Sequence, residues 1–226
     1  MVPLIFCIFF RKKINTKELK VFFVYSIFQA LFAILCTLAF YAFKSFPTYI
    51  LVLRFHSVFE YILISYFLYL LIRNKIVKKI ILFLTIPYLI FSVYDFFKFG
   101  NQTFSNDPSL VEFLILILFI IFFLFEKMQY SIDVPVYQTI NFWISVGLFV
   151  YFTGTFFYIL LVKNTNNSDI NLKKQLLIIN SVVIIIKNVI LGFAFFKDED
   201  KCVDDSVFKL PSELDLDSFY PNNNLN

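Results

Sequence analysis

The chain has 226 residues, of which 60% are hydrophobic and only 16% are charged. Soluble domains carry about 25% charged residues, and a single soluble core of this size could not bury so much apolar surface. The composition therefore excludes a cytosolic enzyme or a nucleic-acid-binding protein and indicates that lipid surrounds most of the chain. The net charge of +4 comes from short basic clusters between apolar stretches, so it reports membrane orientation.

The first apolar stretch, residues 2–10, is too short to cross a membrane, because nine helical residues extend only about 13 Å. Arg11, Lys12 and Lys13 follow this stretch, whereas a signal peptide has its basic residues before the apolar core. We predict a short seventh hydrophobic helix here, or the remainder of a span that begins upstream.

Six further apolar runs are long enough to cross about 30 Å of hydrocarbon as helices. They comprise residues 21–43, 49–72, 80–97, 109–125, 136–162 and 176–196. The breaks between them carry Pro, Gly, Asn and Lys and leave no room for another domain. We predict an all-α fold, a polytopic transmembrane helical bundle of six full spans at residues 1–196, followed by an acidic, disordered tail at residues 197–226.

The basic residues between the spans predict the orientation. Thirteen lie on the side that includes residues 11–20, 73–79 and the tail, and five lie on the other side. Because cytoplasmic loops carry the excess of Lys and Arg, we expect the N-terminus outside and the C-terminus in the cytoplasm, in the plasma (inner) membrane. The predicted partners are the lipid bilayer and a cytoplasmic protein that meets the tail, with no nucleic acid.

Two charged residues of opposite sign lie near the middle of their spans. An ionisable side chain within a span costs about 2.5–3.5 kcal/mol, so it requires a partner or a cavity. Glu60 lies at the midpoint of residues 49–72 and Lys187 one residue past the midpoint of residues 176–196, in helices of the same direction. We predict that the two side chains pair inside the bundle, either as a structural contact or as a ligand, proton or ion site.

Further polar residues accompany this pair. His56 lies one turn from Glu60 on nearly the same helical face. On the last span, Lys173, Asn180 and Lys187 recur every seven residues, with Ser181 and Asn188 alongside. We expect this stripe to face the bundle and the last helix to be central. The predicted buried polar centre comprises Glu60, Lys187, His56, Asn180 and Asn188.

A second polar cluster is predicted near the outer surface. Arg54, Asp95 and Glu112 lie at similar depth in three different spans, close to His56. The cluster is either a polar site within the bundle or a set of side chains that reach the aqueous interface from the helix ends.

The fifth of these runs, residues 136–162, carries small residues and tyrosines on one face. Gly147, Tyr151, Gly154 and Tyr158 share this face. Glycines permit a close approach of a neighbouring helix, and tyrosine hydroxyls can donate hydrogen bonds across it. We therefore predict a tightly packed helix–helix contact.

Catalytic and cofactor motifs do not occur in the sequence. A single histidine cannot supply a multi-histidine zinc site, and there is neither a G-x-S-x-G motif nor a P-loop. We predict no enzyme activity, no metal and no cofactor.

Three segments carry a resemblance to known proteins. They are residues 54–61, with Arg54, His56 and Glu60; residues 141–154, with Trp143, Gly147 and Gly154; and residues 186–191, with Lys187. The chain resembles an uncharacterised bacterial family of small six- to seven-helix membrane proteins. The resemblance implies the helix count and a bacterial inner membrane.

The interpretation that follows is a membrane sensor or ligand-binding component with a buried Glu/Lys polar centre. One alternative is a small transporter or proton-coupled carrier in which Glu60 changes protonation, and another is a structural subunit of a membrane complex. A retinal-binding protein is a further alternative, in which Lys187 and Glu60 would correspond to the Schiff-base lysine and its counter-ion. Against it, Trp143 is the only tryptophan, whereas retinal pockets generally use several.

Overall fold

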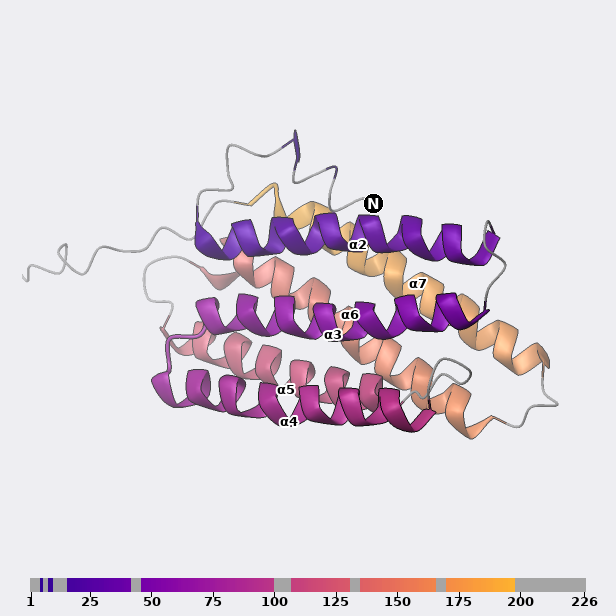
Figure 1. The fold of residues 1–226 in the computed structure, drawn as a ribbon. Helices are drawn as coiled ribbons and strands as arrows, with labels where there is room; N and C mark the ends of the chain where they lie inside the picture. Colours follow the sequence, from indigo (N-terminus) through magenta and orange to yellow (C-terminus); the bar gives the residue numbers. More distant parts are fainter. Residues whose placement is uncertain are drawn as a thin grey trace, which may run out of the picture.

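The computed structural model describes residues 5, 8–9, 16–41, 46–99, 107–130, 135–165 and 170–197. Its long elements are six α-helices, shown in Figure 1. They are α2 (Lys17–Tyr41), α3 (Phe46–Leu71), α4 (Lys75–Phe99), α5 (Asp107–Tyr130), α6 (Ile140–Asn164) and α7 (Ile170–Ala194). Each has 24 to 26 residues, so each is about 36 to 39 Å long at 1.5 Å per residue.

All six helices are long and apolar enough to span a membrane, as the sequence predicted, and they support a membrane location. Their limits differ from the predicted ones. α4 begins at Lys75 and α7 at Ile170, well before the apolar runs, because backbone hydrogen bonding continues into the polar residues that flank the hydrocarbon. α6 begins only at Ile140, since the residues after Pro135 form the short 3₁₀ helix η2 (Val136–Gln138).

Two predictions fall largely outside the described residues. The short N-terminal helix was expected at residues 2–10, of which only residues 5, 8 and 9 are described, and the structure does not show it as an element. The tail at residues 197–226 is described only at Lys197.

The helices pack in an order that differs from their order in the chain. α3 and α5 each pack against three others: α3 against α2, α4 and α5, and α5 against α3, α4 and α6. α7 packs chiefly on α6 and diverges from α2 along its length (Figure 1). The expectation that the last helix is central was therefore wrong. Its many aliphatic residues outside the polar stripe face outward to lipid, for example Ile178, Ile185 and Val189.

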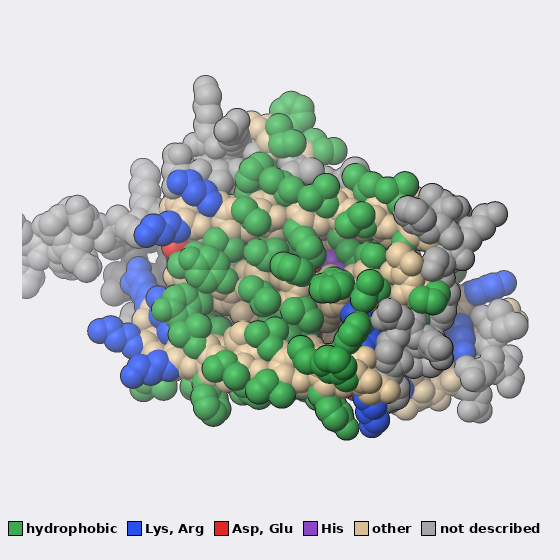
Figure 2. Space-filling model, in the orientation of Figure 1, with side chains coloured by type: hydrophobic (Ala, Val, Ile, Leu, Met, Phe, Trp, Pro, Cys, Tyr) green, Lys and Arg blue, Asp and Glu red, His purple; other side chains and the backbone are tan. Residues whose placement is uncertain are grey.

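The core lies where α3, α5 and α6 meet. Fully buried side chains recur there at helical spacing, namely Tyr61, Ile64 and Leu68 of α3, Leu116 and Ile120 of α5, and Ile144, Leu148 and Phe152 of α6. Large apolar side chains also cover the outside, with Phe83 74% and Phe97 80% exposed on α4. Figure 2 shows these hydrophobic side chains over the middle of the molecule and Lys and Arg toward the helix ends. This distribution is that of a protein surrounded by lipid.

A buried carboxylate fixes the connection between α3 and α4. Glu126, near the end of α5 and 7% exposed, accepts hydrogen bonds from the backbone N–H groups of Arg73 (3.0 Å) and Asn74 (2.8 Å). Asn74 Oδ1 in turn accepts the N–H of Ile76 at the start of α4 (2.8 Å). The N–H groups of Arg73 and Asn74 precede a helix and would lack partners without Glu126. Glu126 therefore anchors the turn between α3 and α4 to α5.

Candidate functional site: a buried polar centre

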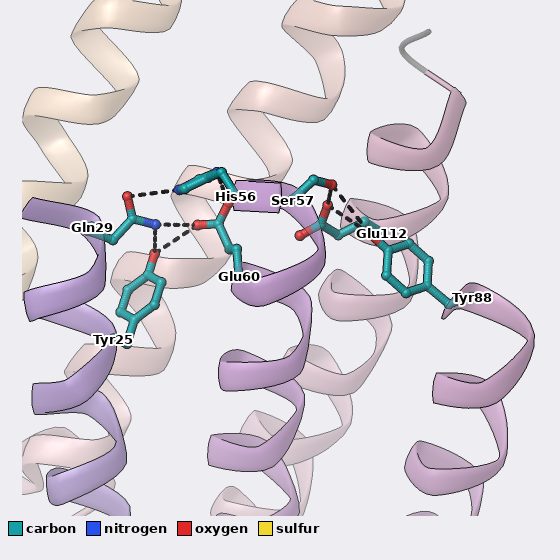
Figure 3. A network of polar contacts seen from close by, with 7 residues as sticks. All are labelled: Tyr25, Gln29, His56, Ser57, Glu60, Tyr88 and Glu112. Carbon is teal, nitrogen blue, oxygen red and sulfur yellow. Dashed lines mark hydrogen bonds and ion pairs between the residues drawn. The ribbon is translucent and has the colours of Figure 1, made fainter. Parts of the chain in front are cut away.

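The centre is built around Glu60, in the middle of α3. Its carboxylate is buried, with the residue only 2% exposed. Oε1 accepts hydrogen bonds from the Tyr25 hydroxyl (2.9 Å) and from Gln29 Nε2 (2.7 Å), both on α2 (Figure 3). Tyr25 and Gln29 lie one turn apart on the same helical face, so α2 presents two donors to one acceptor. Sequence reasoning missed both residues, although their spacing of four on one span was a signal.

His56, on α3 like Glu60, contacts both Glu60 and Gln29. Its Nδ1 lies 3.6 Å from Glu60 Oε2, and its Nε2 lies 3.3 Å from Gln29 Oε1. The imidazole also stacks against the rings of Phe28 and Phe32. The predicted proximity of His56 and Glu60 is confirmed, because residues four apart on a helix face one another. Gln29, His56 and Glu60 form a closed ring of contacts across the α2–α3 interface.

This ring constrains the position of a proton. Gln29 donates through Nε2 to Glu60, so the Gln29 Oε1 atom faces His56 Nε2. An amide oxygen can only accept, so this hydrogen bond places a hydrogen on His56 Nε2. His56 Nδ1 then faces a carboxylate oxygen. The two atoms are within ion-pair distance, so a proton on Nδ1 or on Glu60 Oε2 would make their contact favourable. The His56–Glu60 pair is thus a candidate proton-binding group in the middle of a span.

Lys187 does not form the predicted ion pair with Glu60. Its ammonium lies 3.9 Å from the centroid of the Tyr151 ring on α6, a cation–π contact, and the residue is 7% exposed. The physical reason is the helix order: α2, not α7, packs on the face of α3 that carries Glu60. Glu60 still acts electrostatically on Lys187, so both belong to one polar interior.

The two asparagines of the predicted centre do not join it. Asn180 and Asn188 are half-buried on α7. Neither is hydrogen-bonded to Glu60, His56 or Lys187 in the part of the chain that the structure describes. Ser181, on the same stripe, is exposed and donates to the Leu177 carbonyl oxygen of its own helix (2.9 Å).

A second buried carboxylate, Glu112 of α5, lies beside the network. It is completely buried, and its Oε2 accepts hydrogen bonds from the Ser57 hydroxyl on α3 and from the Tyr88 hydroxyl on α4 (3.3 Å for Tyr88). Figure 3 shows Ser57 on the same helix as Glu60, on the side that faces Glu112. The two carboxylates act on each other electrostatically. Ser57 and Tyr88 were not predicted from the sequence.

The predicted outer cluster divides into two parts. Arg54 and Asp95 do meet, with Nη2 and Oδ2 3.4 Å apart, and the Arg54 guanidinium also lies over the Phe96 ring. Glu112 is absent from this pair because its bonds to Ser57 and Tyr88 hold it deeper in the bundle. Arg54 and Asp95 are well buried, with side chains 12% and 7% exposed, so they do not simply reach outward to the aqueous interface.

The close helix–helix contact predicted at Gly147 and Gly154 is the contact between α6 and α7. A Cβ atom at Gly154 would lie 2.5 Å from Val183 Cγ1, and one at Gly147 would lie 3.0 Å from Leu191 Cδ2. Tyr151, on the same face, makes the cation–π contact with the Lys187 ammonium. Tyr158 is half-buried and forms no hydrogen bond with the residues described. Close helix packing at the glycines is confirmed.

Six membrane-length helices and a buried set of ionisable side chains define the class: a multi-pass helical membrane protein with a buried polar centre. In the described part of the chain, no group of three or more His, Cys, Asp or Glu side chains could hold a metal ion. Comparisons with family models, curated proteins and solved structures find no match for this chain.

Proposed function

We propose that this protein is a membrane sensor that responds to protons at the Gln29–His56–Glu60 network. The observation that carries the proposal is the approach of His56 Nδ1 to Glu60 Oε2, at 3.6 Å, inside the buried ring with Gln29, where a proton on either atom would make the contact favourable. A group that holds one proton can gain a second or lose the first as conditions change. Ionisable groups buried within spans serve such roles more often than their counterparts in soluble proteins.

The network is placed where a change of charge would alter helix packing. Its donors, Tyr25 and Gln29, are on α2, and its acceptor Glu60 is on α3. α2 packs on the bundle chiefly through α3. Protonation of Glu60 removes the charge that strengthens both hydrogen bonds, so it loosens the contact of α2 with α3 around Tyr25 and Gln29. A movement of α2 is the signal that this proposal requires.

The other titratable groups around Glu60 belong to this response. Tyr151 of α6 and Glu112 of α5 interact electrostatically with it, as does Lys187 of α7. Lys187 is positive when protonated and Glu112 is negative when ionised, so each contributes to the charge of the centre. The response is therefore a property of the whole centre.

The proposal includes a membrane and an orientation. We place the protein in a bacterial inner membrane, with the basic ends of α2 and α4 at the cytoplasmic surface, on the resemblance and the distribution of Lys and Arg. The signal would then pass to a cytoplasmic protein through the acidic residues after Lys197. As a sensor the protein catalyses no reaction.

A proton-coupled carrier is the second candidate. The observation that favours it is Glu112, a second buried carboxylate, which is hydrogen-bonded to Ser57, one turn before Glu60 on α3. Two buried carboxylates linked to one turn of a helix allow a proton to be passed between sites, as a carrier requires.

The test measures the distance between α2 and α3. Spin labels at the lipid-facing positions Leu31 and Phe55, which are 55% and 58% exposed, report it in nanodiscs, in a background without the three native cysteines. We expect the distance distribution to change with pH in the wild type and to be insensitive to pH in Glu60→Gln. Glu126→Gln is the matched control, because Glu126 is also buried but lies outside the network, and it should respond like the wild type.

Two results separate the candidates. A folded wild-type protein whose α2–α3 distance does not change with pH would refute the sensor. Dissipation of a pH gradient across proteoliposomes, lost in Glu60→Gln and Glu112→Gln, would favour the carrier.

A further inference from the structure

A small polar cavity lies between α3, α4 and α5, at the end of the bundle where α5 begins. The Arg54–Asp95 ion pair lines it, together with the hydroxyl-bearing residues Ser57, Ser92 and Ser109. Each of the three helices therefore contributes at least one polar side chain. Most of the bundle interior is apolar, so this lining sets the cavity apart.

The size of the cavity decides what can occupy it. Its volume is about 30 Å³. A water molecule needs roughly 10–15 Å³ of space open to a water-sized sphere, whereas organic ligands occupy pockets of roughly 300–1,000 Å³. The cavity thus has room for one or two water molecules and none for an organic ligand. A charged pair and three hydroxyls supply the hydrogen-bond partners that such waters require.

Ser57 connects this cavity to Glu112. It lines the cavity and donates its hydroxyl hydrogen to Glu112 Oε2, which also accepts from Tyr88. Glu112 Oε1 is buried and accepts no hydrogen bond from the residues described. An ionised carboxylate with an unpartnered oxygen in a membrane interior is costly, and a bound proton removes that cost.

We infer that water in this cavity carries protons to Glu112 through Ser57, which makes Glu112 a second proton-binding site. In the transfer, a protonated cavity water gives a proton to Ser57 Oγ. The serine O–H bond that points to Glu112 breaks, and a new O–H bond forms on Oε2. Ser57 is left neutral, Glu112 becomes a carboxylic acid, and the donor becomes water.

The charges around Glu112 are compatible with this role. α3 contributes Glu60 and Arg54, α4 contributes Tyr88 and Asp95, and α6 contributes Tyr151. Arg54 is paired with Asp95, so the entry carries little net charge that would repel a proton. The inference goes beyond the proposed function, since proton uptake at Glu112 does not require that the His56–Glu60 pair change its protonation.

The experiment uses infrared difference spectroscopy of the full chain in nanodiscs. A protonated carboxyl group has its own C=O stretching band, which shifts when the proton is exchanged for deuterium. We expect Glu112→Gln to remove one pH-dependent band. Glu112→Asp retains a carboxyl group and should shift the band, which keeps the test valid if the glutamine variant does not fold.

The route is tested by the rate at which this band exchanges in D₂O. Ser57→Ala removes the relay and Ser92→Val fills part of the cavity, so each should slow the exchange several-fold. Ser65→Ala is the matched control, a buried serine of α3 outside the cavity lining, and it should exchange like the wild type.

Three outcomes would overturn the inference. The first is that no pH-dependent band disappears or shifts in the Glu112 variants. The second is an unchanged exchange rate in both Ser57→Ala and Ser92→Val. The third is a band lost in Glu60→Gln and retained in Glu112→Gln, which would leave the proposed function intact and exclude Glu112 as a proton site.

Discussion

The network predicts that Glu60 is energetically coupled more strongly to Tyr25 than to Lys187. Glu60→Leu removes the acceptor of two donors, Tyr25 and Gln29, at 2.9 and 2.7 Å. A buried donor left without a partner costs about 1–3 kcal/mol. Gln29 Nε2 also donates to the Tyr25 hydroxyl oxygen (3.0 Å), so Gln29 keeps one partner while the Tyr25 O–H loses its acceptor. We therefore expect Glu60→Leu to lower the free energy of unfolding by about 1–3 kcal/mol in total.

The coupling follows from a double-mutant cycle. Hydrogen bonds between membrane helices contribute about 0.6 kcal/mol on average and at most about 1.7 kcal/mol. We expect Tyr25→Phe and Glu60→Leu to couple within this range. Lys187→Met and Glu60→Leu should couple less strongly than this pair, because the Lys187 ammonium lies on the Tyr151 ring and forms no ion pair with Glu60.

The assay is reversible unfolding in bicelles by steric trapping, applied to the single and double variants. Lys187→Met with Glu60→Leu serves as the internal comparison, since both cycles contain the same Glu60→Leu substitution. A coupling energy with Lys187 that exceeds the coupling with Tyr25 would refute the assignment of α2 as the partner of Glu60.

Three further predictions concern stability and use the same assay. Gly154→Ala should destabilise the protein by about 1–3 kcal/mol. The new Cβ would lie 2.5 Å from Val183 Cγ1, and the β-branched Val183 side chain has no other favourable rotamer in a helix. A neutral effect would contradict the close α6–α7 packing. Glu126→Ala should lower the stability by about 1–3 kcal/mol, because two backbone N–H groups lose their acceptor. Glu126→Gln keeps one oxygen and should lower it less. Equal losses would argue against these two hydrogen bonds. Lys163→Met should change stability by less than about 1 kcal/mol, because its ion pair with Asp107 is about half exposed; a larger loss would show that the pair is shielded from water.

Contacts within one helix could be predicted, whereas of the contacts between helices the Arg54–Asp95 pair was predicted and the Glu60–Lys187 ion pair was wrong. The proximity of His56 and Glu60 follows from their spacing of four, since the α-helix fixes the relative position of such residues. The same reasoning placed Glu60 and Lys187 at one depth in the membrane. Depth alone does not decide which helix faces which, and Lys187 meets Tyr151 instead.

The sequence by itself determined the six spans and the residues that would be costly to bury within them. Both follow from local properties, because the length of an apolar run and the charge of a side chain do not depend on the neighbouring helices. Only the tertiary structure decided the partners: Tyr25 and Gln29 for Glu60, and Ser57 and Tyr88 for Glu112. These contacts depend on the order in which the helices pack and on their rotation about their axes, and side-chain packing along each helix sets both.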